Sequence, residues 1–321
     1  MNKEKWKISF DTISRKYGIF VVFIVLLLLG TVTADSFLTA RNITNVLRQI
    51  AVTGVLALAE MLLIISGNID LSLGSVIALS GMFSVSAYLS TGSLSWLVVM
   101  SCVCGLYVYV YFKRYFCCEN KAPAFIATMA MDYIARGLCY LYTGGQATYE
   151  IGDYGKISST YFVGIPLPIF FFLGCAIVCW IILNRLPLGR DVYAIGGNQD
   201  AAKASGINVD FTIIKTFAMA GLLTGIAAVL QIARVNSAIP NTAENYHGDA
   251  IAAAVIGGTS FTGGIGTVMG CLVGACIMGF LSNWLNLIGL GSYFQMVTKG
   301  FIILLALSID MLGKNKRIKR K

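Results

Sequence analysis

The sequence predicts an all-α polytopic membrane protein with about ten transmembrane segments, some of them broken. Hydrophobic residues make up 57% of the 321 residues and charged residues only 12%, whereas charged residues make up roughly 25% of soluble domains. The apolar runs are long rather than alternating, which favours membrane helices over the strands of a β-barrel. The 34 glycines suit the close packing of helices in lipid.

Apolar segments follow one another along the chain, so residues 1–321 are expected to form a single transmembrane domain. The first segment follows a basic arm, residues 1–18. A secretory signal peptide begins in the same way, but no small-residue cleavage site follows and the rest of the chain is also apolar. We therefore expect a retained first span. The segments are predicted at about 19–29, 46–65, 71–89, 94–112, 122–142, 166–183, 211–233, 250–256, 267–288 and 293–312.

The Lys and Arg residues predict the orientation, because cytoplasmic loops of membrane proteins carry an excess of them. With ten segments both termini lie on one side, and that side collects 18 of the 24 basic residues. They lie in the arm 1–18, at 113–121, in the loop 184–210 with Lys215, and in the tail 313–321. Both termini are therefore predicted to be cytoplasmic. The net charge of +9 follows from this topology, and no nucleic-acid partner is expected.

Two glycine-rich segments interrupt the apolar pattern, one in each half of the chain. In the first, 66–75, Gly67 and Asn68 are expected to break a helix, and Asp70 or Ser72 to cap the next one. Broken backbone at membrane depth is tolerated only inside protein or beside a water-filled cavity. The alternatives are a solvated cytoplasmic hairpin for this segment and simple close packing for the glycines of the second, 257–266.

Paired interruptions of this kind point to the central pathway of a transporter. The candidate pathway residues are Gly67, Asn68, Asp70, Ser72, Gly74, Gly257, Gly258, Thr259, Ser260 and Gly264.

Four ionisable residues lie deepest in the predicted spans, namely Glu60, Asp132, Arg136 and Lys299. Intramembrane charges are candidates for function. Asp132 and Arg136 are four residues apart, so we expect a structural pair on one helix face. Lys299 is expected to extend its amine toward the membrane surface. The four form no ordered acidic path, which disfavours an ion-coupled secondary transporter, the main alternative.

Motifs of enzymes and of cofactor sites are missing from the sequence. No G-x-x-x-x-G-K-[ST], H-E-x-x-H or G-x-S-x-G motif is present. The chain is therefore not expected to hydrolyse ATP, and an intramembrane enzyme would lack a catalytic pair. The nine cysteines lie mostly in apolar runs and have no metal-binding spacing. We expect no catalytic residue, no metal and no cofactor bound by this chain.

The loop 184–210 is the longest hydrophilic stretch within the chain. Asn198 can cap a short helix, 199–204, which Gly206 would end. A short helix on a cytoplasmic face is suited to docking a soluble partner, although a plain linker is the alternative. The candidate docking residues are Gly197, Asn198, Ala201, Ala202, Ser205 and Gly206.

Nine short motifs occur together along the chain. They are NITNVL at 42–47, IDLSLGS at 69–75, FIAT at 125–128, LGR at 188–190, YAIGGN at 193–198, SGINV at 205–209, DAIAAAVIGGTS at 249–260, GGIG at 263–266 and SYFQM at 292–296. With these motifs the chain resembles, over nearly its whole length, the permease subunits of bacterial ABC importers for simple sugars, the ribose, xylose and galactoside group. One stretch departs from this pattern: residues 107–118 are bulky and aromatic where these permeases have small residues, which is expected to disturb packing of the fourth segment.

The resemblance implies the partners and the mechanism. The loop 184–210 would contain the coupling helix that docks a separate cytoplasmic ATP-binding subunit, and that subunit would use the ATP. An extracytoplasmic binding protein would deliver the sugar. A second copy or paralogue of the permease would complete the pathway in the bacterial cell membrane.

Overall fold

The computed structural model describes residues 2–113, 123–149 and 151–318. The side chains of residues 1–17 and 309–321, which hold almost all of the predicted basic arm and tail, lie outside the described set. The long helices are α1 (Asn2–Thr33), α2 (Ala40–Ile65), α3 (Leu73–Thr91), α4 (Leu94–Lys113), α5 (Ala124–Thr143), α7 (Leu167–Arg185), α10 (Val209–Val235), α12 (Val268–Leu287) and α13 (Ser292–Ile318).

Short elements connect these helices. The short helices are η2 (Gly152–Gly155), α6 (Lys156–Ser159), α8 (Pro187–Gly197), α9 (Gln199–Ala204) and α11 (Tyr246–Ile256). The strands are β1 (Thr148–Tyr149), β2 (Tyr161–Phe162), β3 (Ile165–Pro166) and β4 (Ser237–Ala238). They form two antiparallel pairs, β1 with β4 and β2 with β3.

Several described helices can cross a membrane, which confirms a polytopic all-α membrane protein. Five are long and apolar enough by themselves, namely α2, α3, α7, α10 and α12. Helices α1, α4 and α13 contain shorter apolar stretches, Gly18–Thr33, Val98–Tyr111 and Ser292–Leu305. The count of ten segments and the cytoplasmic position of both termini stay predictions.

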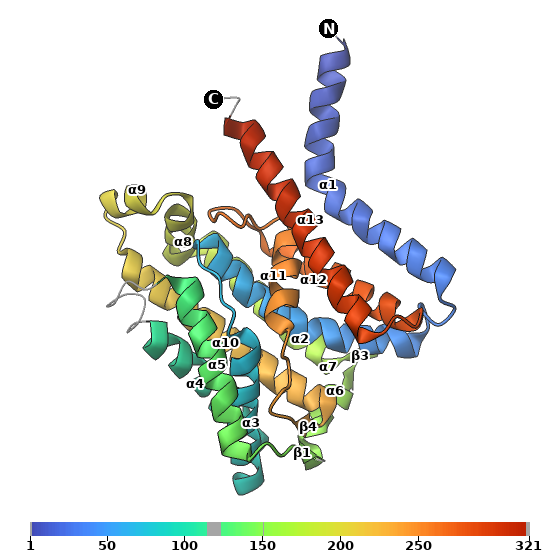
Figure 1. Ribbon diagram of the computed structural model, residues 1–321, viewed down its shortest axis with the longest axis vertical. Helices are drawn as coiled ribbons and strands as arrows, with labels where there is room; N and C mark the ends of the chain where they lie inside the picture. Colours follow the sequence, from blue (N-terminus) through green and yellow to red (C-terminus); the bar gives the residue numbers. More distant parts are fainter. Residues whose placement is uncertain (1, 114–122, 150, 319–321) are drawn as a thin grey trace.

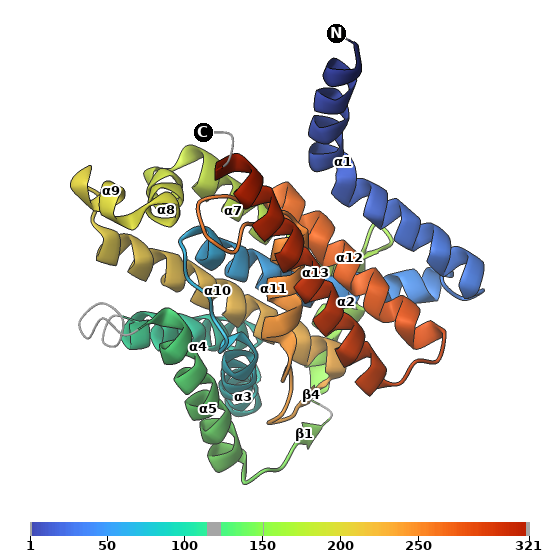
Figure 2. The ribbon, with the colours of Figure 1, turned by 45° about the horizontal axis from the view of Figure 1, so that its top comes forward.

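Helix α2 is the centre of the fold. It packs against α7, α10, α11 and α12 and passes between them in both views (Figure 1 and Figure 2). Helices α3, α4 and α5 lie on one side of this centre, and α1, α12 and α13 on the other. Every residue of α2 from Ile50 to Ile65 is buried, which explains why its sequence is apolar on all faces rather than on one stripe.

Glycines bring α4 and α10 into close contact. A side chain at Gly105 would overlap the carbonyl oxygen of Gly221, and the Ser101 hydroxyl donates to the Gly225 carbonyl at 2.9 Å. Tyr109 is buried, with its ring centroid 6.1 Å from that of Phe217. The expected disturbance of the fourth segment is therefore not seen at Tyr109, and residues 114–118 of that stretch lie outside the described set.

The loop 143–163 between α5 and α7 is mostly exposed, but a few of its side chains are buried. Tyr154 is fully buried, Ile151 is nearly so, and both pack against α3 and α10. The Tyr154 hydroxyl lies 3.1 Å from the Ser84 hydroxyl. These spaced apolar side chains hold the loop against the two helices.

Candidate functional site

The first break follows α2, as predicted. Gly67 has a φ of +80°, a conformation that glycine adopts at little cost, and the Asn68 amide donates to the Leu63 carbonyl at 2.9 Å. The chain then runs extended from beside α8 to the start of α3 (Figure 1). Ser72 is the N-cap residue of α3, but its side chain accepts no hydrogen bond from the first turn of that helix. Its amide and its hydroxyl both donate to Asp70 Oδ1 at 2.7 Å, so Asp70 organises the turn.

The break is buried among protein groups. Asp70 and Glu60 are both fully buried, and the Asp70 amide donates to Glu60 Oε1 at 3.2 Å. The Leu71 amide donates to the Thr128 hydroxyl at 3.3 Å, and the Tyr109 hydroxyl lies beside the Asp70 carboxyl group. A cytoplasmic hairpin with a solvated Asp70 is therefore excluded, and this backbone satisfies the condition for irregular structure at membrane depth.

Gly74 connects the end of the first break to the chain before α11. A Cβ there would overlap the carbonyl oxygen of Ala243, so only glycine allows this approach. The same Ala243 carbonyl accepts from the Tyr246 amide at 3.1 Å. The start of α3 and the start of α11 are therefore held together.

The second break separates α11 from α12. Gly258 and Gly264 have φ values of +87° and +72°, and the Thr259 amide donates to the Ala254 carbonyl at 3.0 Å. The Ser260 amide closes the loop on the Ile265 carbonyl at 2.9 Å. Gly257 instead serves close packing, because a Cβ there would lie 2.6 Å from the Gly270 carbonyl oxygen of α12.

The predicted helix in loop 184–210 is present with the predicted ends. Helix α9 spans Gln199–Ala204, the Asn198 side chain accepts from the Ala201 amide at 2.9 Å, and Gly206 has a φ of +85°. Ala201, Ser205 and Gly206 are exposed, as are Gly197 and Asn198. Ala202 is buried in a small cluster with Ile195 and Val209, so it holds α9 against α8 and α10 rather than facing a partner.

Both breaks meet the end of α8 at a contact that we call the glycine junction, formed by Ile65, Gly196, Gly197, Gly263 and Gly264. The Gly264 amide donates to the Ile65 carbonyl at 2.8 Å. A Cβ on Gly196 would overlap that carbonyl, and one on Gly264 would lie 2.9 Å from the Gly197 Cα. The three chain segments therefore touch through backbone atoms.

Tyr193 of α8 adds a side-chain contact to the junction. Its hydroxyl donates to the Gly266 carbonyl at 2.8 Å. Burial raises the pKa of Tyr193, so the hydroxyl keeps its proton and stays a donor at neutral pH. The sequence pattern identified Gly197 and Gly264 separately, but it gave no sign that they are neighbours.

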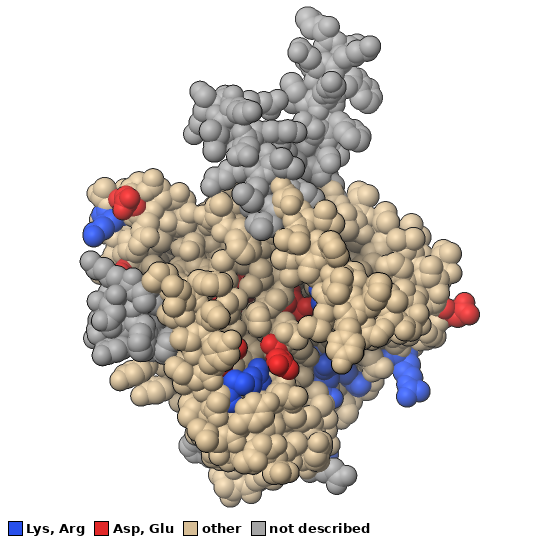
Figure 3. All heavy atoms as spheres, in the orientation of Figure 1, with Lys and Arg blue, Asp and Glu red and all other residues tan. Residues whose placement is uncertain are grey.

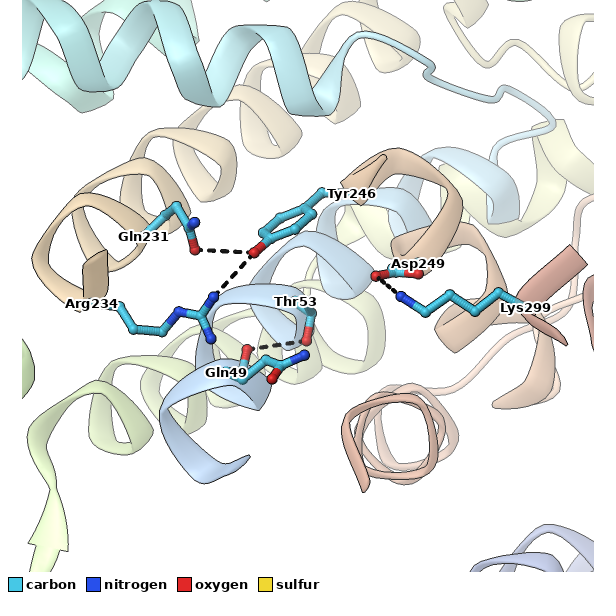
Figure 4. A network of polar contacts seen from close by, with 7 residues as sticks. All are labelled: Gln49, Thr53, Gln231, Arg234, Tyr246, Asp249 and Lys299. Carbon is cyan, nitrogen blue, oxygen red and sulfur yellow. Dashed lines mark hydrogen bonds and ion pairs between the residues drawn. The ribbon is translucent and has the colours of Figure 1, made fainter. Parts of the chain in front are cut away.

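A second polar region, drawn in Figure 4, lies away from the glycine junction. We call it the distal network, consisting of Gln49, Gln231, Arg234, Tyr246, Asp249 and Lys299. Gln49 is 16 residues before Ile65 on α2, which places it roughly 24 Å along the helix from the junction at 1.5 Å per residue.

Hydrogen bonds join part of this network. Arg234 Nη2 donates to the Tyr246 hydroxyl, and that hydroxyl donates to Gln231 Oε1, each at 3.3 Å. Lys299 Nζ and Asp249 Oδ2 form an ion pair at 2.8 Å. The prediction that Lys299 extends toward the membrane surface was wrong, because its partner on α11 is close in space and distant in sequence.

Arg136 also has a different partner from the predicted Asp132. Its Nη1 donates to the carbonyls of Pro240 and Thr242, at 2.7 and 2.9 Å. Asp132 Oδ1 has no hydrogen-bond partner among the described residues. Arg136 thereby anchors the loop before α11. It bonds two carbonyl groups of that loop instead of the single carboxylate of Asp132 on its own helix.

The comparison with known families decides the class of protein. The family model described as branched-chain amino acid transport system / permease component matches residues 42–307. The chain belongs to this family of permease components. The permease is 37% identical to the ribose import permease protein RbsC of Bacillus subtilis (strain 168), over 97% of each chain. It is 33% identical to the D-allose transport system permease protein AlsC of Escherichia coli (strain K12), over 96% of this chain and 95% of that one.

A third relative is the L-arabinose transport system permease protein AraH of Escherichia coli (strain K12), 32% identical over 95% of this chain and 93% of that one. No solved structure matches the permease significantly. The relatives are permease components of sugar importers, so this protein is a transport subunit of that class and not an enzyme. They give no support to an ion-coupled secondary transporter.

Proposed function

We propose that this permease is the membrane-spanning subunit of an ATP-driven importer for a simple sugar in the bacterial cell membrane, with both termini in the cytoplasm. The names of its relatives, which import ribose, allose and arabinose, support the substrate class. The observation that carries the mechanism is the glycine junction, where the Gly264 amide donates to the Ile65 carbonyl and Gly196 packs against both groups. Through Gly196 this contact joins the coupling loop to both breaks.

Helix α9 is the proposed docking element for a separate ATP-binding subunit. It stands at the edge of the molecule next to α8 (Figure 2), and its exposed Ala201 and Ser205 are small enough to enter a cleft. Docking interfaces concentrate binding energy in a few residues. The partner would bind and hydrolyse the ATP, and this chain would bind no cofactor.

Movement of α9 would reach the breaks through α8. Ala202 ties α9 to Ile195 of α8, and Gly196 follows at the junction. Displacement of the junction would shift Gly67–Ser72 and the loop around Gly264 together. This movement would open the pathway to one side of the membrane and then to the other. A second permease copy or paralogue would share that pathway. An extracytoplasmic binding protein would deliver the sugar to the far side. The sugar would then cross by population shift between two states.

Reconstitution tests this function. The permease is co-expressed with its ATP-binding subunit and binding protein, purified, and inserted into liposomes that enclose ATP. ATP-dependent uptake of radiolabelled ribose, allose, xylose or arabinose is the expected result. Uptake that needs an ion gradient and proceeds without the ATP-binding subunit would contradict the proposal.

A further inference from the structure

The distal network gathers polar side chains from four helices around one region. Figure 4 shows Gln231 and Arg234 of α10 pointing toward Tyr246 of α11, Lys299 of α13 pointing toward Asp249 of α11, and Gln49 of α2 on the near side of the same region. Gln231 is 3% exposed, whereas Gln49, Arg234, Tyr246, Asp249 and Lys299 are half-buried. Figure 3 shows charged atoms recessed among uncharged ones in the middle of the face in view. Half-buried polar groups such as those of the network can reach a small solute.

Two of these side chains keep hydrogen-bonding capacity that their neighbours do not use. Arg234 Nε is buried and has no hydrogen-bond partner within the described part of the chain, although Nη2 of the same side chain bonds Tyr246. Gln49 contributes its backbone carbonyl to Thr53, and its side-chain amide makes no hydrogen bond to any described residue. More than nine in ten buried polar groups are satisfied, so the free Arg234 Nε is suited to a transient ligand, and the half-buried Gln49 amide can contribute further hydrogen bonds.

The charges select the kind of ligand. Lys299 and Asp249 neutralise each other at 2.8 Å, so Arg234 is the one uncompensated charge of the network. An arginine and an amide offer several donors to hydroxyl oxygens, and the amide oxygen accepts in return. The Tyr246 ring provides an apolar face for the C–H groups of a sugar. A neutral polyhydroxylated ring uses all of these groups, whereas a cation would be repelled by Arg234.

The network is also connected to the first break. The Tyr246 amide donates to the Ala243 carbonyl, against which Gly74 packs. Gln231 Nε2 donates to the Thr242 hydroxyl at 3.4 Å. A shift of the break at Gly74 would therefore move Tyr246 and Gln231, which changes the fit of any ligand between them. This gives a physical route from a moved coupling loop to release of the ligand.

From this geometry we infer that the distal network is the transit site of the permease, where Gln49, Arg234 and Tyr246 bind a neutral aldopentose or aldohexose during its passage. The inference rests on the proposed function and adds the residues that hold the sugar. Gln231 positions the Tyr246 hydroxyl by accepting its hydrogen bond. The site is expected to be weak, because a transit site must release what it binds.

Two variants test the site in the reconstituted complex. Gln49→Leu keeps the volume of the side chain and removes its hydrogen bonds, and Tyr246→Phe keeps the ring and removes the hydroxyl. The matched controls are Gln146→Leu and Tyr142→Phe; Gln146 is exposed in a loop, and the Tyr142 hydroxyl bonds Ser86. Uptake rates of ribose, allose, xylose and arabinose are measured for each protein, and co-purification of the ATP-binding subunit confirms assembly.

The ratio between the four sugars is the informative readout. Gln49→Leu and Tyr246→Phe are expected to lower uptake at least tenfold for the best sugar and to change the ratio between two sugars at least fivefold, while both controls stay within twofold of the wild type. A uniform loss for all four sugars, or no change, would overturn the transit site alone. A wild-type complex that imports none of the four would overturn the proposed function together with the site.

Discussion

The amide of Gly264 donates a hydrogen bond to the carbonyl oxygen of Ile65 at 2.8 Å, and Gly196 lies directly against both residues. Gly196→Ala would place a Cβ where the Ile65 carbonyl stands. Overpacking of this kind costs about 1–3 kcal/mol. We expect a lower melting temperature and a loss of uptake of at least tenfold. The control is Gly174→Ala on α7, where a Cβ meets nothing within 4 Å; equal behaviour of the two variants would contradict a tight junction.

The turn at Asp70 offers a second test, of stability. Asp70→Ala would leave the buried amide and hydroxyl of Ser72 without their acceptor, and an unsatisfied buried group costs about 1–3 kcal/mol. Asp70→Asn keeps a carbonyl oxygen at the same place and should lose less. Thermal unfolding in detergent, followed by circular dichroism, measures the difference. If Asn and Ala destabilise the protein equally, the oxygen at this position does not organise the break.

The exposed side of α9 is expected to be needed for coupling. Ala201→Arg places a bulky charge on that side, so membrane levels should stay near normal while uptake and co-purification of the ATP-binding subunit are lost. An interface change of this kind can cost roughly 2 kcal/mol or more. Ser159→Arg makes the same change of charge at an exposed position that is predicted to lie on the other side of the membrane, and should be tolerated. A fully active Ala201→Arg protein would show that the loop is only a linker and does not dock the ATP-binding subunit.

The predicted topology can be measured with single cysteines. Ser159 and Ser205 are both exposed, so cysteines at these positions should react readily in a background without the nine native cysteines. A membrane-impermeant maleimide added to whole cells should label Ser159→Cys and spare Ser205→Cys. Labelling of both positions before lysis would refute the assigned orientation.

The ion pair between Lys299 and Asp249 predicts a rescue. Lys299→Met leaves the Asp249 carboxylate without its partner inside the membrane, where an unpaired charge is costly. Both side chains are partly exposed, at 23% and 15%, so the loss should be smaller than the roughly 3–5 kcal/mol of a fully buried pair. The double variant with Asp249→Asn should regain most of the lost melting temperature. A double variant less stable than Lys299→Met alone would exclude the pairing.

Local signals in the sequence predicted much of the fold. The residues Asn198 and Gly206 predicted helix α9, because an N-cap residue and a left-handed glycine act on residues within one turn. The break at Gly67 was predicted for the same reason. The ends of most long helices also lie close to the ends of the apolar runs, since the transition from apolar to polar sequence marks them, but α1 begins at Asn2, within the basic arm.

Contacts between distant parts of the chain could not be predicted in this way. Gly196 and Ile65 are 131 residues apart, and nothing in either local sequence names the other. The pair Asp132–Arg136 was predicted from helical spacing, but carbonyls more than 100 residues away bind Arg136. The distal network was missed because Gln231 and Tyr246 belong to no local sequence motif, and only the fold brings them together.

The contact at Gly196 is made of backbone atoms, and this affects how force passes through the molecule. A side chain between two helices can absorb a small displacement by changing its rotamer, whereas a peptide group has no such freedom. The junction is therefore stiff in compression, because its contacting backbone atoms cannot rearrange without moving the helices themselves. A displacement of α8 is therefore expected to reach Ile65 and Gly264 with little loss.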